Sequence, residues 1–511
     1  WLYLHLILFF WGILRLMWQS ICITFSVCLF GLTNCTVGPT YEIPELTMGI
    51  PDEWHNALTK DFTNRGVGVQ SWWTRFDDPM LVSLIHDAQA QNLTLQMATS
   101  SLRQARASYG VAAAEYVPDI TAKGGYQREQ SSDNSPGLAN FPAVNAQPVN
   151  DFSVGLDASW EIDLWGGIAK NVEAASATFG AELEQYRDTL ISLRAEVASS
   201  YINIRTLQIK RELTMKYNDS LRQLLSLIED QYEQGTISKS DLEQERAAYD
   251  QGITELPNVS MSLQKEYARL AVLLSTDAQS IESRLSTIFP VPRASPNVAV
   301  GIPADLVRRR PDIRKAERVL AAQTALVGSA MSDLYPRLSL SGAFGYEATE
   351  SNEFIRWSSR TYGFGPSFSW DIFNGNRIKS QIQLKEEKTN EAFLNWELTV
   401  LNAFAEVETA MLNLILSGRV QESMNDASQS LLEAFTLTEQ EYLAGIIQKQ
   451  SLLQAEQNFI NAQIVLVEKI GTVSQNLVLL YKALGGDWEN GPTPDVPPIQ
   501  TNTTTHVRSA Q

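Results

Sequence analysis

The chain has 511 residues, and its 58 acidic and 40 basic side chains give a formal net charge of −18. Nucleic-acid binding needs clustered Lys and Arg, and the only tight basic cluster is Arg308–Arg310, so we expect no nucleic-acid partner. Cys22, Cys28 and Cys35 all lie in the first 35 residues and the four His are scattered. Few ligands are therefore left for thiolate or metal chemistry, and no cofactor is expected.

Residues 1–34 are almost wholly apolar and long enough to cross a bilayer. The run ends in Leu-Thr-Asn-Cys at Cys35, which resembles a bacterial lipoprotein signal, in which the Cys becomes the acylated first residue. We therefore expect a signal peptide at 1–34, with Met17 as an alternative start, and lipidation at Cys35. Thr36 in place of Asp favours sorting to the outer membrane. The alternative is an uncleaved signal anchor.

A repeat organises the rest of the chain. Ser-Trp-Glu-Ile at 159–162 returns as Ser-Trp-Asp-Ile at 369–372, and Tyr232-x-x-Gly235 returns as Tyr442-x-x-Gly445, in both cases 210 positions later. We expect two copies of one unit at 75–275 and 303–485. They would be preceded by a lipidated extension at 35–74, joined by a linker at 276–302, and followed by a disordered tail at 486–511.

Each copy predicts a helix, a β-hairpin and a long helical hairpin, in that order. The β-hairpins are expected at 118–164 and 337–373, because apolar and polar residues alternate over 120–127, 152–164, 338–346 and 361–372. The helical hairpins are expected at 167–275 and 376–484, with heptad-like apolar spacing and turns at Gly235 and Gly445. A continuous helix from 168 to 232 would be about 100 Å long.

The strands predict a transmembrane β-barrel. Their apolar face is rich in aromatic residues, which suits lipid, and their polar face carries acids that would line the lumen and favour cations: Asp157, Glu161, Asp163 and Asp371. Four strands cannot close a barrel, so at least two copies of the chain must combine. The long helices would project on one side of the membrane and extend the pore. The alternatives are a half-buried sheet and a solid coiled-coil stalk.

Several motifs resemble the TolC/OprM family of outer-membrane efflux channels, in the NodT-like lipoprotein branch of RND efflux systems. They include Cys35-Thr-Val-Gly-Pro-Thr-Tyr41, Trp72-Trp-Thr-Arg-Phe76, the segment from Gly301 to Arg314, and Tyr335-Pro-Arg-Leu-Ser-Leu-Ser-Gly342. The resemblance implies a homotrimer with one 12-stranded barrel in the outer membrane and a helical tunnel in the periplasm. It also implies two partners, a periplasmic adaptor and an inner-membrane RND-type pump.

The family resemblance also assigns the periplasmic end. The hairpin tips that contact the adaptor correspond to Gly235, Thr236, Gly445 and Ile446. The family's gate tyrosine matches Tyr442, whereas its gate arginine falls at Ile447 and its two aspartates fall on Ser451 and Gln454. Acids of the first copy, such as Asp241, Glu243 and Glu245, could replace the missing aspartates. The alternative is that all of these are ordinary solvated helix ends.

The predicted fold class is a mixed α+β membrane protein, with four transmembrane strands per protomer and periplasmic helical hairpins that form an α-barrel. The predicted function is a passive exit duct for small molecules, gated by adaptor binding. Alternatives are the exit duct of a type I protein-secretion system and a lipid-anchored spacer without a pore. Glu161 and Asp163 could in principle serve glycosidic chemistry, but a solvated lumen explains them better, so we expect no enzyme.

Overall fold

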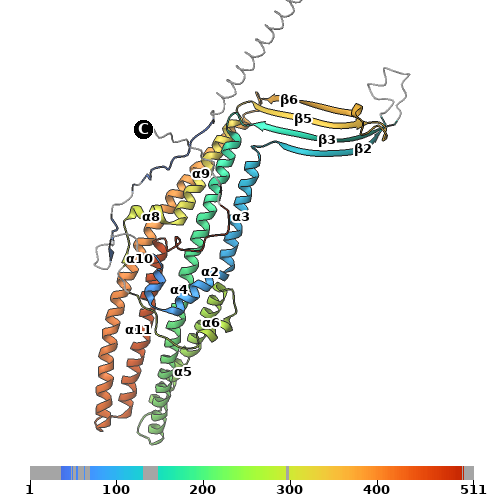
Figure 1. Cartoon of the computed structure of the whole chain (residues 1–511). Helices are drawn as coiled ribbons and strands as arrows, with labels where there is room; N and C mark the ends of the chain where they lie inside the picture. Colours follow the sequence, from blue (N-terminus) through green and yellow to red (C-terminus); the bar gives the residue numbers. More distant parts are fainter. Residues whose placement is uncertain are drawn as a thin grey trace, which may run out of the picture. The chain divides into compact units, whose positions relative to one another are not determined.

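The computed structural model describes residues 36–47, 49, 53–55, 62–63, 69–130, 148–294, 298–497 and 499. The predicted signal peptide and Cys35 lie outside these residues. The chain divides into two compact units. The first comprises residues up to 43, 104–179 and 318–393, and the second comprises 44–103, 180–317 and 394 onward. The first unit contains a four-stranded sheet, and the second contains the helical hairpins (Figure 1).

The sheet of the first unit is antiparallel throughout. Its strands are β2 (Asp119–Glu129), β3 (Val149–Ile162), β5 (Arg337–Ala348) and β6 (Arg360–Ser369), in the spatial order β2-β3-β5-β6 (Figure 1). The two hairpins of the repeat therefore lie side by side in one sheet, and β3 of the first copy pairs with β5 of the second.

The register of the sheet places the apolar residues of all four strands on the same face. Leu156 is the middle of one such row, because it lies opposite Ala122 on β2 and opposite Phe344 on β5, which in turn lies opposite Tyr362 on β6. Directly opposed residues point to the same face of a sheet. The predicted separation of an apolar and a polar face is therefore confirmed, and much of the apolar face is exposed, with Phe364 at 85%.

Two strands end earlier than the alternation predicts. β3 ends at Ile162 and not at 164, and β6 ends at Ser369 and not at 372. The last pair of β6 joins Ser369 to Arg337, which is the first residue of β5. β6 therefore ends where its neighbouring strand begins.

The second unit holds most of the two long helices, α4 (Gly167–Glu233) and α10 (Arg377–Leu443), each of 67 residues. Both end in the same turn. Gly235 and Gly445 have positive φ angles of 72° and 76°, and the next residue donates its N–H to a carbonyl five positions earlier: Thr236 to Gln231 and Ile446 to Glu441. This Schellman geometry confirms the predicted helix ends.

The returning helix of the first copy is broken, whereas that of the second is continuous. The second copy has α11 (Lys449–Ala483), but the first has α5 (Lys239–Ile253) and α6 (Glu255–Leu273). Pro257 explains the break, because its missing N–H removes a helical hydrogen bond near Ile253. The helix expected before β2 is also broken, into α2 (Pro79–Gln91) and α3 (Leu93–Ala114), and the Asn92 side chain accepts the N–H of Leu95 at 2.9 Å.

The expectation that the chain is disordered from residue 486 is wrong for residues up to 497. Asp487 is fully buried, and its carboxylate accepts the Ser71 N–H at 2.8 Å. The Trp488 ring contacts the guanidinium groups of Arg187 and Arg314, which are 4.2 and 5.1 Å from its ring centre. Contact of the aromatic ring with two cations offsets the entropy cost of ordering a Pro-rich segment.

The remaining elements are short, apart from α9. They are η1 (Trp72–Phe76), α7 (Ala278–Arg284), α8 (Pro303–Arg309), α9 (Pro311–Ser332), η2 (Trp357–Ser359), and the two-residue strands β1 (Phe62–Thr63) and β4 (Val298–Ala299). By length and composition, α10 and α11 could also cross a membrane. Helix α11 makes polar contacts with α10, such as the hydrogen bond from Asn476 to Ser417 at 2.9 Å. We therefore assign the membrane-spanning role to the strands.

Candidate functional site

The polar face of the sheet is the candidate channel lining. It contains a hollow of about 590 Å³ between Thr121, Asp157, Ser341 and Gly363. Gly363 has no atom within 4 Å of the position where a Cβ would lie, so the missing side chain keeps the hollow open. Lys123 and Asp157 form an ion pair of 2.7 Å across β2 and β3. This face can solvate ions and polar groups.

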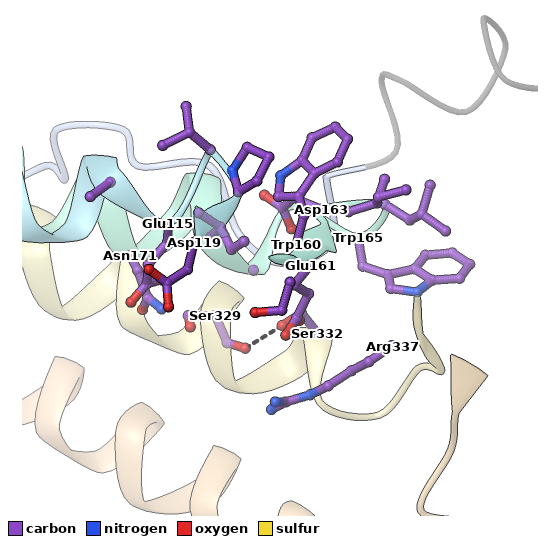
Figure 2. A pocket seen from close by; sticks show the side chains of 18 of the residues that line it. Glu115, Asp119, Trp160, Glu161, Asp163, Trp165, Asn171, Ser329, Ser332 and Arg337 are labelled. Atoms are coloured by element: carbon purple, nitrogen blue, oxygen red, sulfur yellow. Dashed lines mark hydrogen bonds between the residues drawn. The ribbon is translucent and has the colours of Figure 1, made fainter. Parts of the chain in front are cut away.

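A second hollow, of about 770 Å³, lies where the strands meet the helices of the same unit (Figure 2). Carboxylates from β2, β3 and three adjoining loops line it, together with one guanidinium, that of Arg337. Arg337 pairs with Asp333 at 2.6 Å. The carboxylates are Glu115, Asp119, Glu161, Asp163 and Asp333. The surplus of negative charge makes this region attractive to cations.

The four predicted lumen acids divide into two pairs. Asp157 and Glu161 lie on the polar face of β3, as expected. Asp163 and Asp371 lie beyond the strands, at the starts of α4 and α10. Asp163 accepts the Ala169 N–H at 2.8 Å, and Asp371 pairs with Arg377 at 2.9 Å, so both stabilise a helix start.

Sequence reasoning missed Glu115, Asp119 and Asp333. All three lie within three residues of a proline between a helix and the following strand, either Pro118 or Pro336. The nearby prolines were the sequence signal that could have identified these acids, because both prolines place their neighbours at the junction of helix and sheet. Among the described residues, no group of His, Cys, Asp and Glu is arranged to hold a metal ion.

Two tryptophans bind the junction together in the same way in both copies. Trp160 donates its indole N–H to the Tyr116 carbonyl at 3.1 Å, and Trp370 donates its own to the Leu334 carbonyl at 3.0 Å. The N-terminal segment is held nearby, because the Val37 N–H reaches the Trp165 carbonyl at 2.9 Å. Residue 36 is therefore fixed at the end of β3.

The hairpin tips are solvent-exposed turns. Gly235, Thr236 and Gly445 are exposed, and Ile446 is 73% exposed, which leaves an apolar side chain free for a partner. Of the gate candidates, Tyr442 is half-buried, whereas Ser451 and Gln454 are exposed.

The acids of the first tip have local roles. Asp241 forms a capping box with Ser238, in which each side chain accepts the backbone N–H of the other residue. Arg246 pairs with Glu229 at 3.0 Å and with Glu243 at 3.6 Å. Burial raises the pKa of Glu245.

A contact between the two helical hairpins was not foreseen. Leu453 of α11 is buried in a cluster with Leu224 and Ile228 of α4 and Leu242 of α5. We call these four residues the tip cluster. Ser220 of α4 donates to Glu456 of α11 at 3.0 Å beside it. The tip cluster joins the two copies of the repeat close to their tips.

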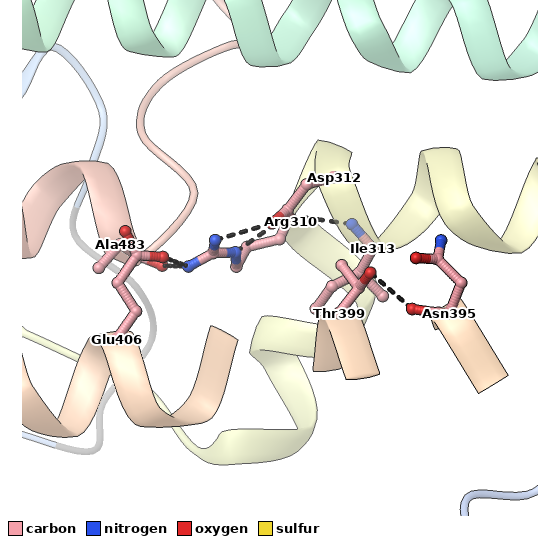
Figure 3. A network of polar contacts seen from close by, with 7 residues as sticks. All are labelled: Arg310, Asp312, Ile313, Asn395, Thr399, Glu406 and Ala483. Carbon is pink, nitrogen blue, oxygen red and sulfur yellow. Dashed lines mark hydrogen bonds and ion pairs between the residues drawn. The ribbon is translucent and has the colours of Figure 1, made fainter. Parts of the chain in front are cut away.

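Arg310 has a structural role (Figure 3). It pairs with Asp312 and Glu406, each at 2.7 Å, and donates to the Ala483 carbonyl at 2.8 Å. Burial lowers the pKa of Arg310, but the two carboxylates outweigh that effect and raise it above its ordinary value. These contacts tie α9, α10 and α11 together.

The comparisons with known proteins identify the family. The model of the family described as "Outer membrane efflux protein" matches residues 84–276 and 302–486. Nodulation protein T of Rhizobium leguminosarum bv. trifolii is 27% identical over 457 residues, which are 89% of this chain and 95% of the relative. Outer membrane protein OprJ of Pseudomonas aeruginosa is 28% identical over 474 residues, which are 91% of this chain and 96% of the relative.

Solved structures agree. The outer-membrane channel OprN has a TM-score of 0.78 at 27% identity, and the match covers 89% of this chain and all of OprN. The Campylobacter jejuni CmeC outer membrane channel has a TM-score of 0.81 at 23% identity, over 90% and 97% of the two chains, and shows the same fold. The predicted fold class, four strands of a trimeric barrel with long helical hairpins, is confirmed. The chain therefore belongs to the outer membrane efflux protein family and is an exit duct for efflux in the outer membrane.

Proposed function

We propose that three copies of the chain form a passive channel for small molecules, which works with a periplasmic adaptor and an inner-membrane RND-type pump. The observation that carries this proposal is the two-faced sheet: one face is apolar and exposed, and the other is polar and hollow. An exposed aromatic face such as this suits the lipid-facing side of an outer-membrane barrel.

The substrate class follows from the relatives and from the charge of the lining. Two relatives from Pseudomonas putida are named as the outer membrane proteins of a solvent efflux pump and an antibiotic efflux pump. The acids around the hollow at the strand ends outnumber its one Arg, Arg337. We therefore propose small organic molecules as cargo, with cationic ones preferred.

We propose that Cys35 carries a lipid. Val37 is held by Trp165 at the end of β3, and Gly38 lies against the backbone of Gly328 on α9. An acyl chain on Cys35 would therefore start near the end of β3. Lipid on this residue would enter the same membrane that the strands occupy.

Gating is proposed at the hairpin tips. Gly235, Thr236, Gly445 and Ile446 would contact the adaptor, and Tyr442, Ser451, Gln454 and Asp241 would surround the gate. The family's charged gate residues are replaced here, and the tip cluster around Leu453 packs the two helical hairpins together near the tips. The adaptor would open the gate because it binds the open arrangement of these helices more tightly than the closed one.

Export by a Gly445→Asp variant tests the tip assignment. Gly445 has a φ of 76°, so any side chain strains the turn, and Asp adds charge where the adaptor would bind. We expect export to fall at least about tenfold while the amount of assembled oligomer is unchanged. The matched control is Gly418→Asp, in the body of α10, where a Cβ meets no atom within 4 Å. Normal export by Gly445→Asp would refute the assignment.

A further inference from the structure

Charged residues are distributed unequally between the two faces of the sheet. The register assigns Arg128 of β2 and Arg360 of β6 to the apolar face, because Arg128 lies opposite Asn150 and Arg360 lies opposite Tyr346. In the four strands, which the structure describes completely, every other residue of this face is uncharged. A face that suits lipid therefore carries two charges, and both are arginines.

Both arginines lie at the same end of the sheet. Arg128 is the last residue but one of β2, and Arg360 is the first residue of β6, so both lie at the end away from the helices of this unit (Figure 1). We call this end of the sheet the far end. The position of both arginines at strand termini, and not along the strands, matches the boundary of a membrane and not its interior.

The length of the apolar face supports this boundary. The uncharged, mostly apolar residues of β3 run from Phe152 to Ile162, which is about 33 Å along the strand and about 25 Å across the membrane at the usual tilt of barrel strands. This value equals the height of the apolar band of an outer-membrane barrel. A residue beyond Phe152 at the far end therefore lies at the level of the lipid headgroups.

We infer that Arg128 and Arg360 bind the phosphate groups of an anionic lipid, whose acyl chains lie against the apolar face of the sheet. A guanidinium group presents N–H donors in a planar fork that fits phosphate oxygens. The inference rests on the proposed channel function in one respect: helices on the periplasmic side place the far end in the outer leaflet of the outer membrane.

The acids of the strands at the far end lie on the other face. The register assigns Glu129, Asp151 and Glu347 to the polar face, with Asp157. Charge is thus separated across the sheet, since the outward side carries guanidinium groups and the inward side carries carboxylates. An anionic ligand is attracted to the outward side only.

The loop between β5 and β6 adds no further cation for a lipid. Its one basic residue, Arg356, pairs with Glu353 at 3.1 Å. Glu350, in the turn after β5, is the other acid of this loop. The lipid contacts are therefore assigned to Arg128 and Arg360, and Arg356 serves as a control.

Arg360 is oriented by an aromatic side chain. Its guanidinium carbon lies 4.5 Å from the centre of the Trp357 ring, and its Nη1 donates to the Trp357 carbonyl at 2.7 Å. The other N–H donors of the guanidinium are not used in this contact. Trp357 is itself 68% exposed, as expected of a tryptophan at the level of the headgroups. Arg360 is thus held in place before a ligand arrives.

Arg128 lies next to a row of aromatic residues. The Tyr126 ring contacts the Phe152 ring at 4.8 Å, and the Phe152 ring lies 6.0 Å from that of Phe354. The Tyr126 hydroxyl donates to the side chain of Asn150 at 3.1 Å, and Asn150 lies opposite Arg128. Apolar rings followed by polar groups and a cation match the order of acyl chain, linkage region and phosphate in a lipid.

The positions of the arginines favour a lipid with more than one phosphate. β2 and β6 are the two edge strands of the sheet. In the trimeric barrel, Arg360 of one copy and Arg128 of its neighbour therefore lie on adjoining strands. A glycolipid with two phosphate groups can contact both copies, and we assign this class of lipid to the site.

Lipid binding to the purified full-length oligomer tests the inference. The probe is lipid A, a glycolipid with two phosphate groups, and the bound fraction is measured by native mass spectrometry. Each of Arg128→Gln and Arg360→Gln is expected to raise the Kd about fivefold, and the double variant about thirtyfold. Arg356→Gln is the matched control, because Arg356 lies close to Arg360 in sequence but pairs with Glu353, and its Kd should equal that of wild type.

Wild-type protein supplies a second test that does not depend on any variant. Lipid A without its phosphate groups is expected to bind about thirtyfold more weakly than the phosphorylated form. Inorganic phosphate at the same concentration as the lipid should not displace it, because free phosphate lacks the chains that contact the apolar face. Displacement by phosphate would assign the site to a free anion and overturn the lipid.

The outcomes separate this inference from the proposed function. Equal Kd values for wild type and the double variant, or for the two forms of the lipid, would overturn the headgroup site, while conductance of the same oligomers would show that the channel stands. A protein that neither oligomerises nor conducts would refute the channel, and with it the membrane orientation on which the site rests.

Discussion

Lys210 of α4 forms ion pairs of 2.8 Å with both Glu468 of α11 and Glu255 of α6. Glu468 belongs to the second copy of the repeat and Glu255 to the first, so one ammonium group connects three helices of the two hairpins. The Lys210 side chain is only 18% exposed, which limits screening of the two pairs by solvent.

Lys210→Met is expected to loosen this connection. The substitution keeps the length of the side chain but leaves two carboxylates without their cation, and we expect a loss of about 1 kcal/mol, because both glutamates are partly exposed. Thermal unfolding of the purified protein in detergent measures the loss. Lys216→Met is the control, because its pair with Glu212 is exposed on both sides. Equal effects of the two substitutions would contradict a special role for Lys210.

The same site predicts a pH dependence. Burial lowers the pKa of Lys210, but hydrogen bonds and charges of Glu255 and Glu468 outweigh this and raise the pKa overall. A raised lysine pKa gives stability that is complete below the unfolded value of about 10.4 and is lost as the pH rises through the folded value. The difference in melting temperature between wild type and Lys210→Met should therefore be constant from pH 7 to 9 and shrink above about pH 10.4. A difference that disappears near neutral pH would contradict this assignment.

Leu453→Ala is expected to destabilise the closed arrangement of the tips. Removal of a buried Leu side chain commonly costs about 2–5 kcal/mol, and here the cavity would form between α11 and the first hairpin. We expect a higher open probability in single-channel recordings, with an unchanged amount of oligomer. Leu443→Ala is the control, because Leu443 is 78% exposed near the same tip. An open probability equal to that of wild type would show that the tip cluster does not hold the gate.

Gly345→Ala is expected to weaken the sheet. Gly345 lies opposite Gly155 on the polar face, and a Cβ on Gly345 would lie 2.6 Å from the Val154 carbonyl oxygen and 3.0 Å from the Gly155 Cα. Backbone atoms cannot move aside cheaply, so we expect a loss of about 1–3 kcal/mol, read as a lower dissociation temperature of the oligomer. Gly363→Ala, with no atom near its Cβ position, should have little effect. If both variants dissociate at the wild-type temperature, the strands are not packed this closely.

The sheet could be predicted from sequence because its physical signal is local. Alternation from Phe152 to Ile162 assigns every residue to a face, and the repeat carries the same assignment to β6. The ends of the strands could not be predicted in this way, because a strand also needs a neighbouring strand to pair with. Asp371 continues the alternation, but β5 begins opposite Ser369, so Asp371 has no residue of β5 to pair with.

The contacts between hairpins could not be predicted. Leu453 and Leu224 are each one of many apolar residues with helical spacing, and only the packing of α11 against α4 selects them. The ordered tail was missed for a similar reason. Pro-rich composition favours disorder, but Asp487 is held by Ser71, and Trp488 is held by Arg187 and Arg314, and all three partners are distant in sequence.

The most direct test of the channel is conductance of the purified protein in a planar bilayer, measured with a salt gradient. We predict conductance steps with a reversal potential that shows preference for cations, and a smaller preference after Asp157→Asn combined with Glu161→Gln, since these acids lie on the polar face of β3. Absence of conductance in wild type and in the Leu453→Ala variant would contradict the account, because a closed gate could no longer explain it.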